Sequence, residues 1–77
     1  MGTEVLFPTM KIIAKKQVFE RSRIVSGLSQ RELARRSGLS HAYVSMIERG
    51  DKTLGPAAAK RLSEALDKSM EELFCIE

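Results

Sequence analysis

The segment Ser40–Gly50, SHAYVSMIERG, carries side chains suited to contacting a partner, and helical spacing would sort them onto two faces. Residues three and four positions apart share a helix face. Val44, Ile47 and Glu48 therefore share one face, which we expect to pack against the rest of the protein. The opposite face offers a hydroxyl, a guanidinium and two apolar groups, from Ala42, Ser45, Met46 and Arg49, with His41 at its border. This second face is free to meet a groove on a partner.

Groups for catalysis or metal binding are scarce in the chain. His41 is the only histidine, which argues against a metal site. Cys75 is the only cysteine, which excludes an intramolecular disulfide and fits a reducing cytoplasm. No histidine or acid is grouped around it in the sequence, so we expect a packed or half-exposed apolar residue rather than a nucleophile. With no triad, metal cluster or phosphate loop, we expect neither an enzyme nor a cofactor.

Charge is unevenly distributed along the 77 residues. Residues 1–56 hold ten basic and five acidic side chains, whereas residues 57–77 hold three basic and five acidic ones. The basic part favours a polyanionic partner, although a solvated surface explains it equally simply. No apolar run approaches the roughly 18 residues of a membrane span, and no secretory signal is visible, so we expect no membrane association and a cytoplasmic location.

Helix-start and helix-stop signals are clear between Gly27 and Gly50. Ser29 and Glu32 have the spacing of a capping box, which predicts a helix start at Ser29. Gly38 is suited to ending this helix, because it adopts a positive φ without strain. Ser40 is the expected N-cap of the next helix, which Gly50 closes.

Further helices are expected on both sides of this pair. Gly55-Pro56 predicts a helix start, and Ser69 with Glu72 forms a second capping box before a final turn or two. A helix from about Met10 to Ser26 is also expected. Its apolar residues do not form one clean stripe, so either part of it faces a partner subunit or the helix begins later. With no strand pattern, the fold class predicted is all-α, a compact bundle of four to five short helices.

A set of small and apolar residues links the two middle helices. Two helices joined by a turn of about three residues must cross closely, which limits side-chain size. Ala34 suits the crossing point and Gly38 suits the turn. Val44 and Ile47 would then fix the second helix to the first and to the core, with Gln30 at the start of the set.

In these positions the sequence resembles the lambda-repressor-like helix-turn-helix family, the Cro/XRE type of phage repressors and many bacterial regulators. The resemblance runs from about Phe19 to Phe74 and includes GLSQRELARRSGLS, YVSMIERG and AAAKRLSEALDKSMEEL. It implies a DNA-binding domain over residues 10–77 with its motif at 29–50, in which Ser40–Arg49 is the recognition helix of the major groove. Residues 1–9 are either an N-terminal arm or a remnant of cloning.

The resemblance also implies roles for individual residues. Base contacts are expected from His41, Ala42, Ser45 and Met46. Phosphate contacts are expected from Gln30, Arg31, Arg35, Tyr43, Arg49 and Lys52. Met46 filling a gap between helices, and Tyr43 as a partly buried ring, remain open alternatives. Arg23 is expected to pair with Glu48, because a buried carboxylate needs a cation or donors.

By the same resemblance, the function expected is sequence-specific transcription regulation by a bacterial or phage-encoded repressor or controller protein. It would bind double-stranded DNA as a homodimer on a pseudo-palindromic operator, and a chain this short suggests no small-molecule ligand. The dimer surface is expected at the C-terminal end, from Met70, Leu73, Phe74 and Ile76, with help from the N-terminal helix. The alternative is an antitoxin-like interaction module of a toxin–antitoxin pair that also binds its own promoter.

Overall fold

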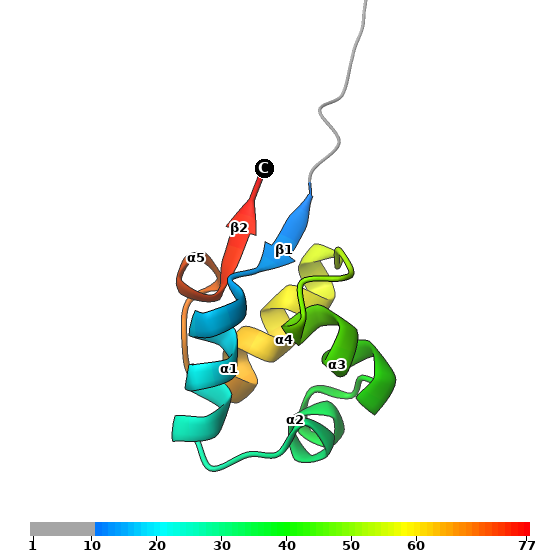
Figure 1. Ribbon diagram of the computed structural model, residues 1–77, viewed down its shortest axis with the longest axis vertical. Helices are drawn as coiled ribbons and strands as arrows, with labels where there is room; N and C mark the ends of the chain where they lie inside the picture. Colours follow the sequence, from blue (N-terminus) through cyan, green and yellow to red (C-terminus); the bar gives the residue numbers. More distant parts are fainter. Residues whose placement is uncertain (1–10) are drawn as a thin grey trace, which may run out of the picture.

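The computed structural model describes residues 11–77 as five short helices and one two-stranded sheet (Figure 1). The elements in chain order are β1 (Ile12–Ala14), α1 (Lys16–Val25), α2 (Gln30–Ser37), α3 (His41–Glu48), α4 (Pro56–Leu66), α5 (Met70–Leu73) and β2 (Phe74–Ile76). The bundle of short helices predicted from the sequence is therefore confirmed. Within residues 11–77, no helix is both long and apolar enough to cross a membrane. The expected N-terminal arm, residues 1–9, lies outside the described residues.

Local capping chemistry fixes the ends of the two middle helices. The Ser29 hydroxyl accepts a hydrogen bond from the Glu32 amide at 3.0 Å, and the Ser40 hydroxyl accepts one from the Tyr43 amide at 3.1 Å. Each bond satisfies a backbone donor that the first helical turn leaves without a partner. Gly38 ends α2 with φ of 72°, a conformation that strains residues with a β-carbon. The turn between α2 and α3 is thus set by residues within it.

The two predicted capping boxes have different outcomes. The box at α5 is complete, because the Glu72 carboxylate also accepts from the Ser69 amide, and these bonds hold the pKa of Glu72 below its usual value. At α2 only the serine half forms. The Glu32 carboxylate turns instead toward two arginines one turn further along, Arg35 and Arg36.

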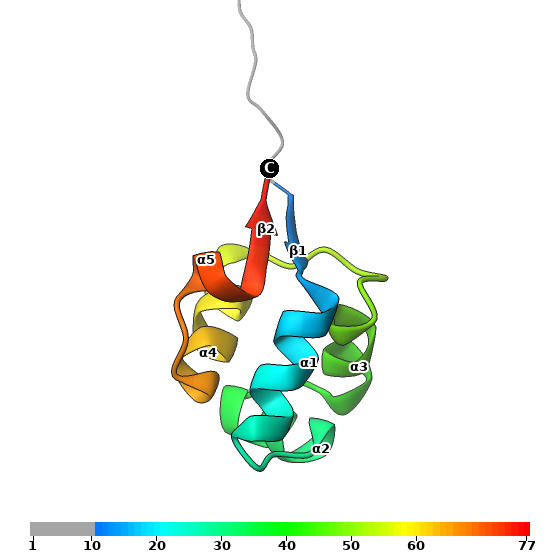
Figure 2. The ribbon, with the colours of Figure 1, turned by 60° about the vertical axis from the view of Figure 1, so that its left-hand side comes forward.

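The expectation of an all-helical chain with a helix from about Met10 to Ser26 is wrong at its beginning. Ile12–Ala14 forms an antiparallel pair with Phe74–Ile76, and α1 begins only at Lys16 (Figures 1 and 2). β-Branched Ile12 and Ile13 favour an extended backbone, and alternation buries Ile12 and Ala14 while Ile13 is half-buried. The helix begins later than expected, the second of the two alternatives that its broken apolar stripe had left open.

The core lies between the helices and beneath this sheet. Its largest fully buried side chains are Phe19, Leu33, Val44, Ile47, Leu62, Leu73 and Phe74. Phe19 of α1 and Phe74 of β2 pack with ring centroids 5.9 Å apart in a tilted arrangement, so the sheet is anchored to the first helix.

This burial corrects the dimer surface expected at the C-terminal end. Leu73 and Phe74 are 0% and 2% exposed within a single chain, so they stabilise the fold and do not face a partner. Their physical role is to close the core over α1 and α4. Met70 is half-buried against the same core, and only Ile76 of the expected set is substantially exposed.

Candidate nucleic-acid interface

Helices α2 and α3 form a tight helix-turn-helix unit around small residues. Ala34 is buried where the helices meet, and its carbonyl accepts a hydrogen bond from the Leu39 amide at 2.9 Å. Ser37, also buried, donates its hydroxyl to the Leu33 carbonyl at 2.8 Å, which satisfies a polar group inside the unit. These contacts fix the end of α2 and the turn that leads to α3. The crossing predicted from the sequence is present.

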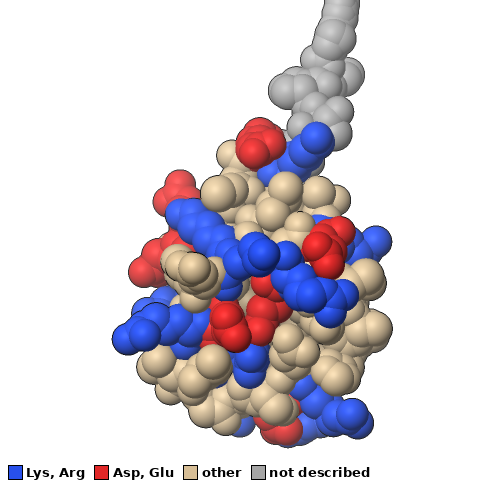
Figure 3. Space-filling view, viewed as in Figure 1, with Lys and Arg blue, Asp and Glu red and all other residues tan. Residues whose placement is uncertain are grey.

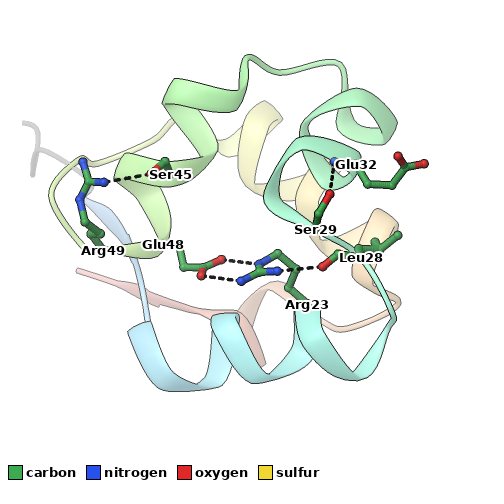
Figure 4. Close-up of polar contacts among 7 residues, drawn as sticks. All are labelled: Arg23, Leu28, Ser29, Glu32, Ser45, Glu48 and Arg49. Atoms are coloured by element: carbon green, nitrogen blue, oxygen red, sulfur yellow. Dashed lines mark hydrogen bonds and ion pairs between the residues drawn. The ribbon is translucent and has the colours of Figure 1, made fainter.

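An ion pair joins α3 to α1. Arg23 donates from Nε to Glu48 Oε1 at 2.7 Å and from Nη2 to Oε2 at 2.9 Å, and its Nη1 donates to the Leu28 carbonyl at 2.8 Å (Figure 4). The two side chains are only 12% and 8% exposed. The hydrogen bonding of Arg23 to the Glu48 carboxylate outweighs the effect of burial and raises the pKa of Arg23 above its ordinary value. This is the pair expected from the sequence, and it holds α1, the segment before α2, and the end of α3 together.

The two faces of α3 differ as their spacing predicts. Val44, Ile47 and Glu48 are buried against the domain. On the other side His41, Ala42 and Arg49 are exposed, while Ser45 and Met46 are half-buried. The structure therefore brings the four expected base-contacting residues, His41, Ala42, Ser45 and Met46, onto the accessible part of one helix.

Arg49 lies across this outer face. It donates from Nη1 to the Ser45 hydroxyl at 2.9 Å, one turn back along α3 (Figure 4), and from Nε to Asp51 Oδ2 at 3.0 Å. Sequence reasoning placed no role on Asp51. The only signal for it was a carboxylate two residues after an arginine at a helix end, a spacing too common to be specific.

The other expected phosphate-contacting residues differ in their exposure and in their contacts. Tyr43 is half-buried and its ring lies 6.0 Å from Lys52 Nζ, a distance at which the ammonium and the ring attract. Gln30 is half-buried at the start of α2, and Arg31 is exposed beside it. Arg35 is exposed but pairs with Glu32. These residues lie on three segments next to each other in the chain: α2, α3 and the loop after α3.

Basic and acidic side chains lie close together on the surface. Figure 3 shows lysine and arginine side chains running obliquely across the middle of the face drawn, with carboxylates on both sides of them. Among residues 11–77, no group of three or more potential metal ligands comes together, and Cys75 is exposed and unpaired. The arrangement is suited to hydrogen bonding and shape contact along α3, with separate cations around it.

Comparison with known proteins gives a family and several similar structures. The HTH_3 family model, described as helix-turn-helix, matches residues 22–73. The restriction-modification controller protein C.AhdI from Aeromonas hydrophila is 37% identical, with a TM-score of 0.70 over 74% of this chain and 86% of its own. The clp gene regulator ClgR from Corynebacterium glutamicum is 30% identical, with a TM-score of 0.67 over 73% of this chain and 60% of its own. The controller protein C.Esp1396I is 30% identical, with a TM-score of 0.63 over 70% of each chain. No match was found among curated proteins.

Replacing Glu48 with glutamine should measure the contribution of the Arg23–Glu48 pair. Loss of one buried partner leaves the other charge without compensation, so we expect Glu48→Gln to lower the free energy of unfolding by about 2–4 kcal/mol. Urea denaturation at a fixed protein concentration measures this. Glu32→Gln is the matched control, because its carboxylate pairs at the surface, and it should cost less than about 1 kcal/mol. Equal small losses for both variants would contradict a structural role for the buried pair.

Proposed function

The chain belongs to the HTH_3 helix-turn-helix family and is a DNA-binding transcription regulator rather than an enzyme, and we propose that it acts as a repressor or controller protein, binding a pseudo-palindromic operator as a homodimer. The proposal of a controller role draws on similarity to two restriction-modification controller proteins. The mode of reading DNA draws on the geometry of α3.

The single observation that carries the proposal is the divided surface of α3. One side is fixed to the domain by Val44, Ile47 and the Arg23–Glu48 pair. On the other side His41, Ala42 and Arg49 are exposed, and Ser45 and Met46 are half-buried. An α-helix fits the major groove of B-DNA, where each base pair presents a distinct pattern of donors, acceptors and methyl groups. A helix whose inner face is packed against the domain presents the same outer side chains to the groove each time the protein meets DNA.

Residue roles follow from chemistry and position. Ala42 and Met46 suit contact with a thymine methyl, whereas His41 and Ser45 suit hydrogen bonds to base edges. Lys52, in the loop after α3, and Gln30 and Arg31, at the start of α2, suit phosphates on either side of the groove. We propose that the four base-contacting residues of α3 supply the preference for one DNA sequence over another. Phosphate contacts, for which Tyr43 and Arg35 are the further candidates, supply affinity that falls with salt.

We place the dimer surface on the outer side of α1. Val25, Ile24 and Val18 are 73%, 57% and 43% exposed, and together with Ile76 they are the large hydrophobic side chains that residues 11–77 leave exposed. Apolar side chains gathered on one exposed helix favour a protein contact. Two copies joined through α1 would present two α3 helices to two half-sites, which the short reading surface of a single helix requires for specificity.

Selection of binding sites from a random DNA pool tests the main proposal. We expect enrichment of a motif made of two inverted half-sites, with centres about 10 base pairs apart or a multiple of that spacing. Enrichment of one unrepeated half-site would contradict the homodimer. Absence of any enrichment at low salt would contradict sequence-specific binding altogether.

Two substitutions should separate base recognition from the sequence-independent attraction to DNA phosphates. Met46→Ala is expected to change the preferred base at one or two positions, because it removes a shape contact inside the groove. Lys52→Ala is expected to weaken all sequences alike and to reduce the slope of log affinity against log salt by about 1. Binding to the selected site and to unrelated DNA, measured by fluorescence anisotropy over a salt series, distinguishes the two effects. Lys68→Ala, in the connection between α4 and α5, is the control and should change neither quantity.

A charged residue on α1 should dissociate the dimer. Val25→Asp places a carboxylate among the exposed apolar side chains, where pairing of two copies would bury like charges against each other. Light scattering coupled to gel filtration should show the wild-type mass halved in this variant, with unchanged circular dichroism. Ile76→Asp is the matched comparison at the C-terminal end and should leave the mass unchanged. The opposite pattern would move the interface from α1 to β2.

A further inference from the structure

The Arg49 backbone lies at the end of α3, but its guanidinium reaches back one turn to Ser45 on the outer face of the helix. Its bond to the Ser45 hydroxyl draws the side chain back by one turn, and its bond to Asp51 holds the other side of the group. Two contacts on different atoms of a planar group limit its rotation as well as its position. A phosphate-binding arginine at a helix end needs neither constraint.

The two bonds leave a usable donor edge. An arginine side chain has five N–H donors in a planar fork. Nε is used by Asp51 and one donor of Nη1 by Ser45, so three donors remain, two on Nη2 and one on Nη1. When Ser45 takes the Nη1 hydrogen nearer the side-chain stem, the other Nη1 donor and one Nη2 donor lie side by side at the end of the group and can donate in parallel to two neighbouring acceptors. In the major groove, the O6 and N7 atoms of guanine form such a pair.

Charge also favours a base over a phosphate. The Asp51 carboxylate offsets the charge of Arg49 and would itself repel a nearby phosphate, which reduces any attraction to the DNA backbone. Both side chains are more than half exposed, so their pair contributes little to folding stability. Lys52 differs, because no carboxylate within residues 11–77 forms an ion pair with it. Attraction to phosphate suits Lys52 better, and the orientation of Arg49 suits recognition of a base.

We infer that Arg49 is a specificity-determining residue that reads one guanine in each half-site, with Asp51 and Ser45 as positioning residues that hold its guanidinium toward the base. The inference rests on the proposed function, since it requires α3 to lie in the major groove. It revises the phosphate role expected for Arg49 from the sequence and gives Asp51 a role in reading DNA.

The test uses the full chain and the site selected by the wild-type protein, with all four bases placed in turn at each position. Arg49→Lys keeps the charge but loses the planar pair of donors. We expect it to reduce the preference for guanine at one position of each half-site by about 10-fold, and to change low-salt affinity for unrelated DNA by less than about 2-fold. Asp51→Asn should also reduce that preference, at the same position, while binding to unrelated DNA is unchanged or stronger.

A phosphate contact makes the opposite prediction. Arg49→Lys would then leave every base preference unchanged, and Asp51→Asn would strengthen all sequences by the same factor; either result would overturn the inference. Glu32→Gln controls for removal of a carboxylate from an exposed arginine pair and should leave base preferences intact. Melting curves check that each variant is folded. If the wild-type protein selects a motif but these variants read it unchanged, only the role of Arg49 fails. If the wild-type protein selects nothing, the proposed function fails with it.

Discussion

The pair between Arg23 and Glu48 is the constraint on which the rest of the arrangement depends. The Glu48 carboxylate, at the end of α3, is almost fully buried. Its burial is tolerated because the Arg23 guanidinium donates to both of its oxygens and also to a backbone carbonyl. That single group therefore sets the distance between α1, the segment before α2 and the end of α3. The outer face of α3 points away from the domain because Val44, Ile47 and the paired Glu48 hold the opposite face against it.

In the proposed complex with DNA, base recognition and attraction to phosphate would be carried largely by different residues. The helix proposed to read DNA carries, among its exposed or half-buried side chains, mainly uncharged groups, whereas most cations lie on neighbouring segments and several are offset by carboxylates. A domain of this kind gains modest affinity from its net charge of +3. Much of its discrimination between DNA sequences must then come from side chains held in one position. The packing of α3 against the domain holds them there.

Local signals in the sequence predicted the middle of the domain well. Ser29, Gly38 and Ser40 act through bonds or dihedral angles within a few residues, so their effects can be read from their neighbours in the chain. The strand pair was missed because Ile12 acquires its extended partner from Ile76, and an isolated run of three residues carries no period. The sequence predicts an interface at Leu73 and Phe74 because two neighbouring apolar residues have the same pattern whether they pack on another chain or on their own core. The bond from Arg49 to Asp51 depends on rotamers, which spacing does not specify.

The pairing of β1 with β2 has a consequence for how the domain would open. The Phe74 ring packs on Phe19 in the first helix, and Leu73 is fully buried beside it. Pulling the two strands apart would therefore expose this aromatic pair to water and uncover the side of the core that α1 closes.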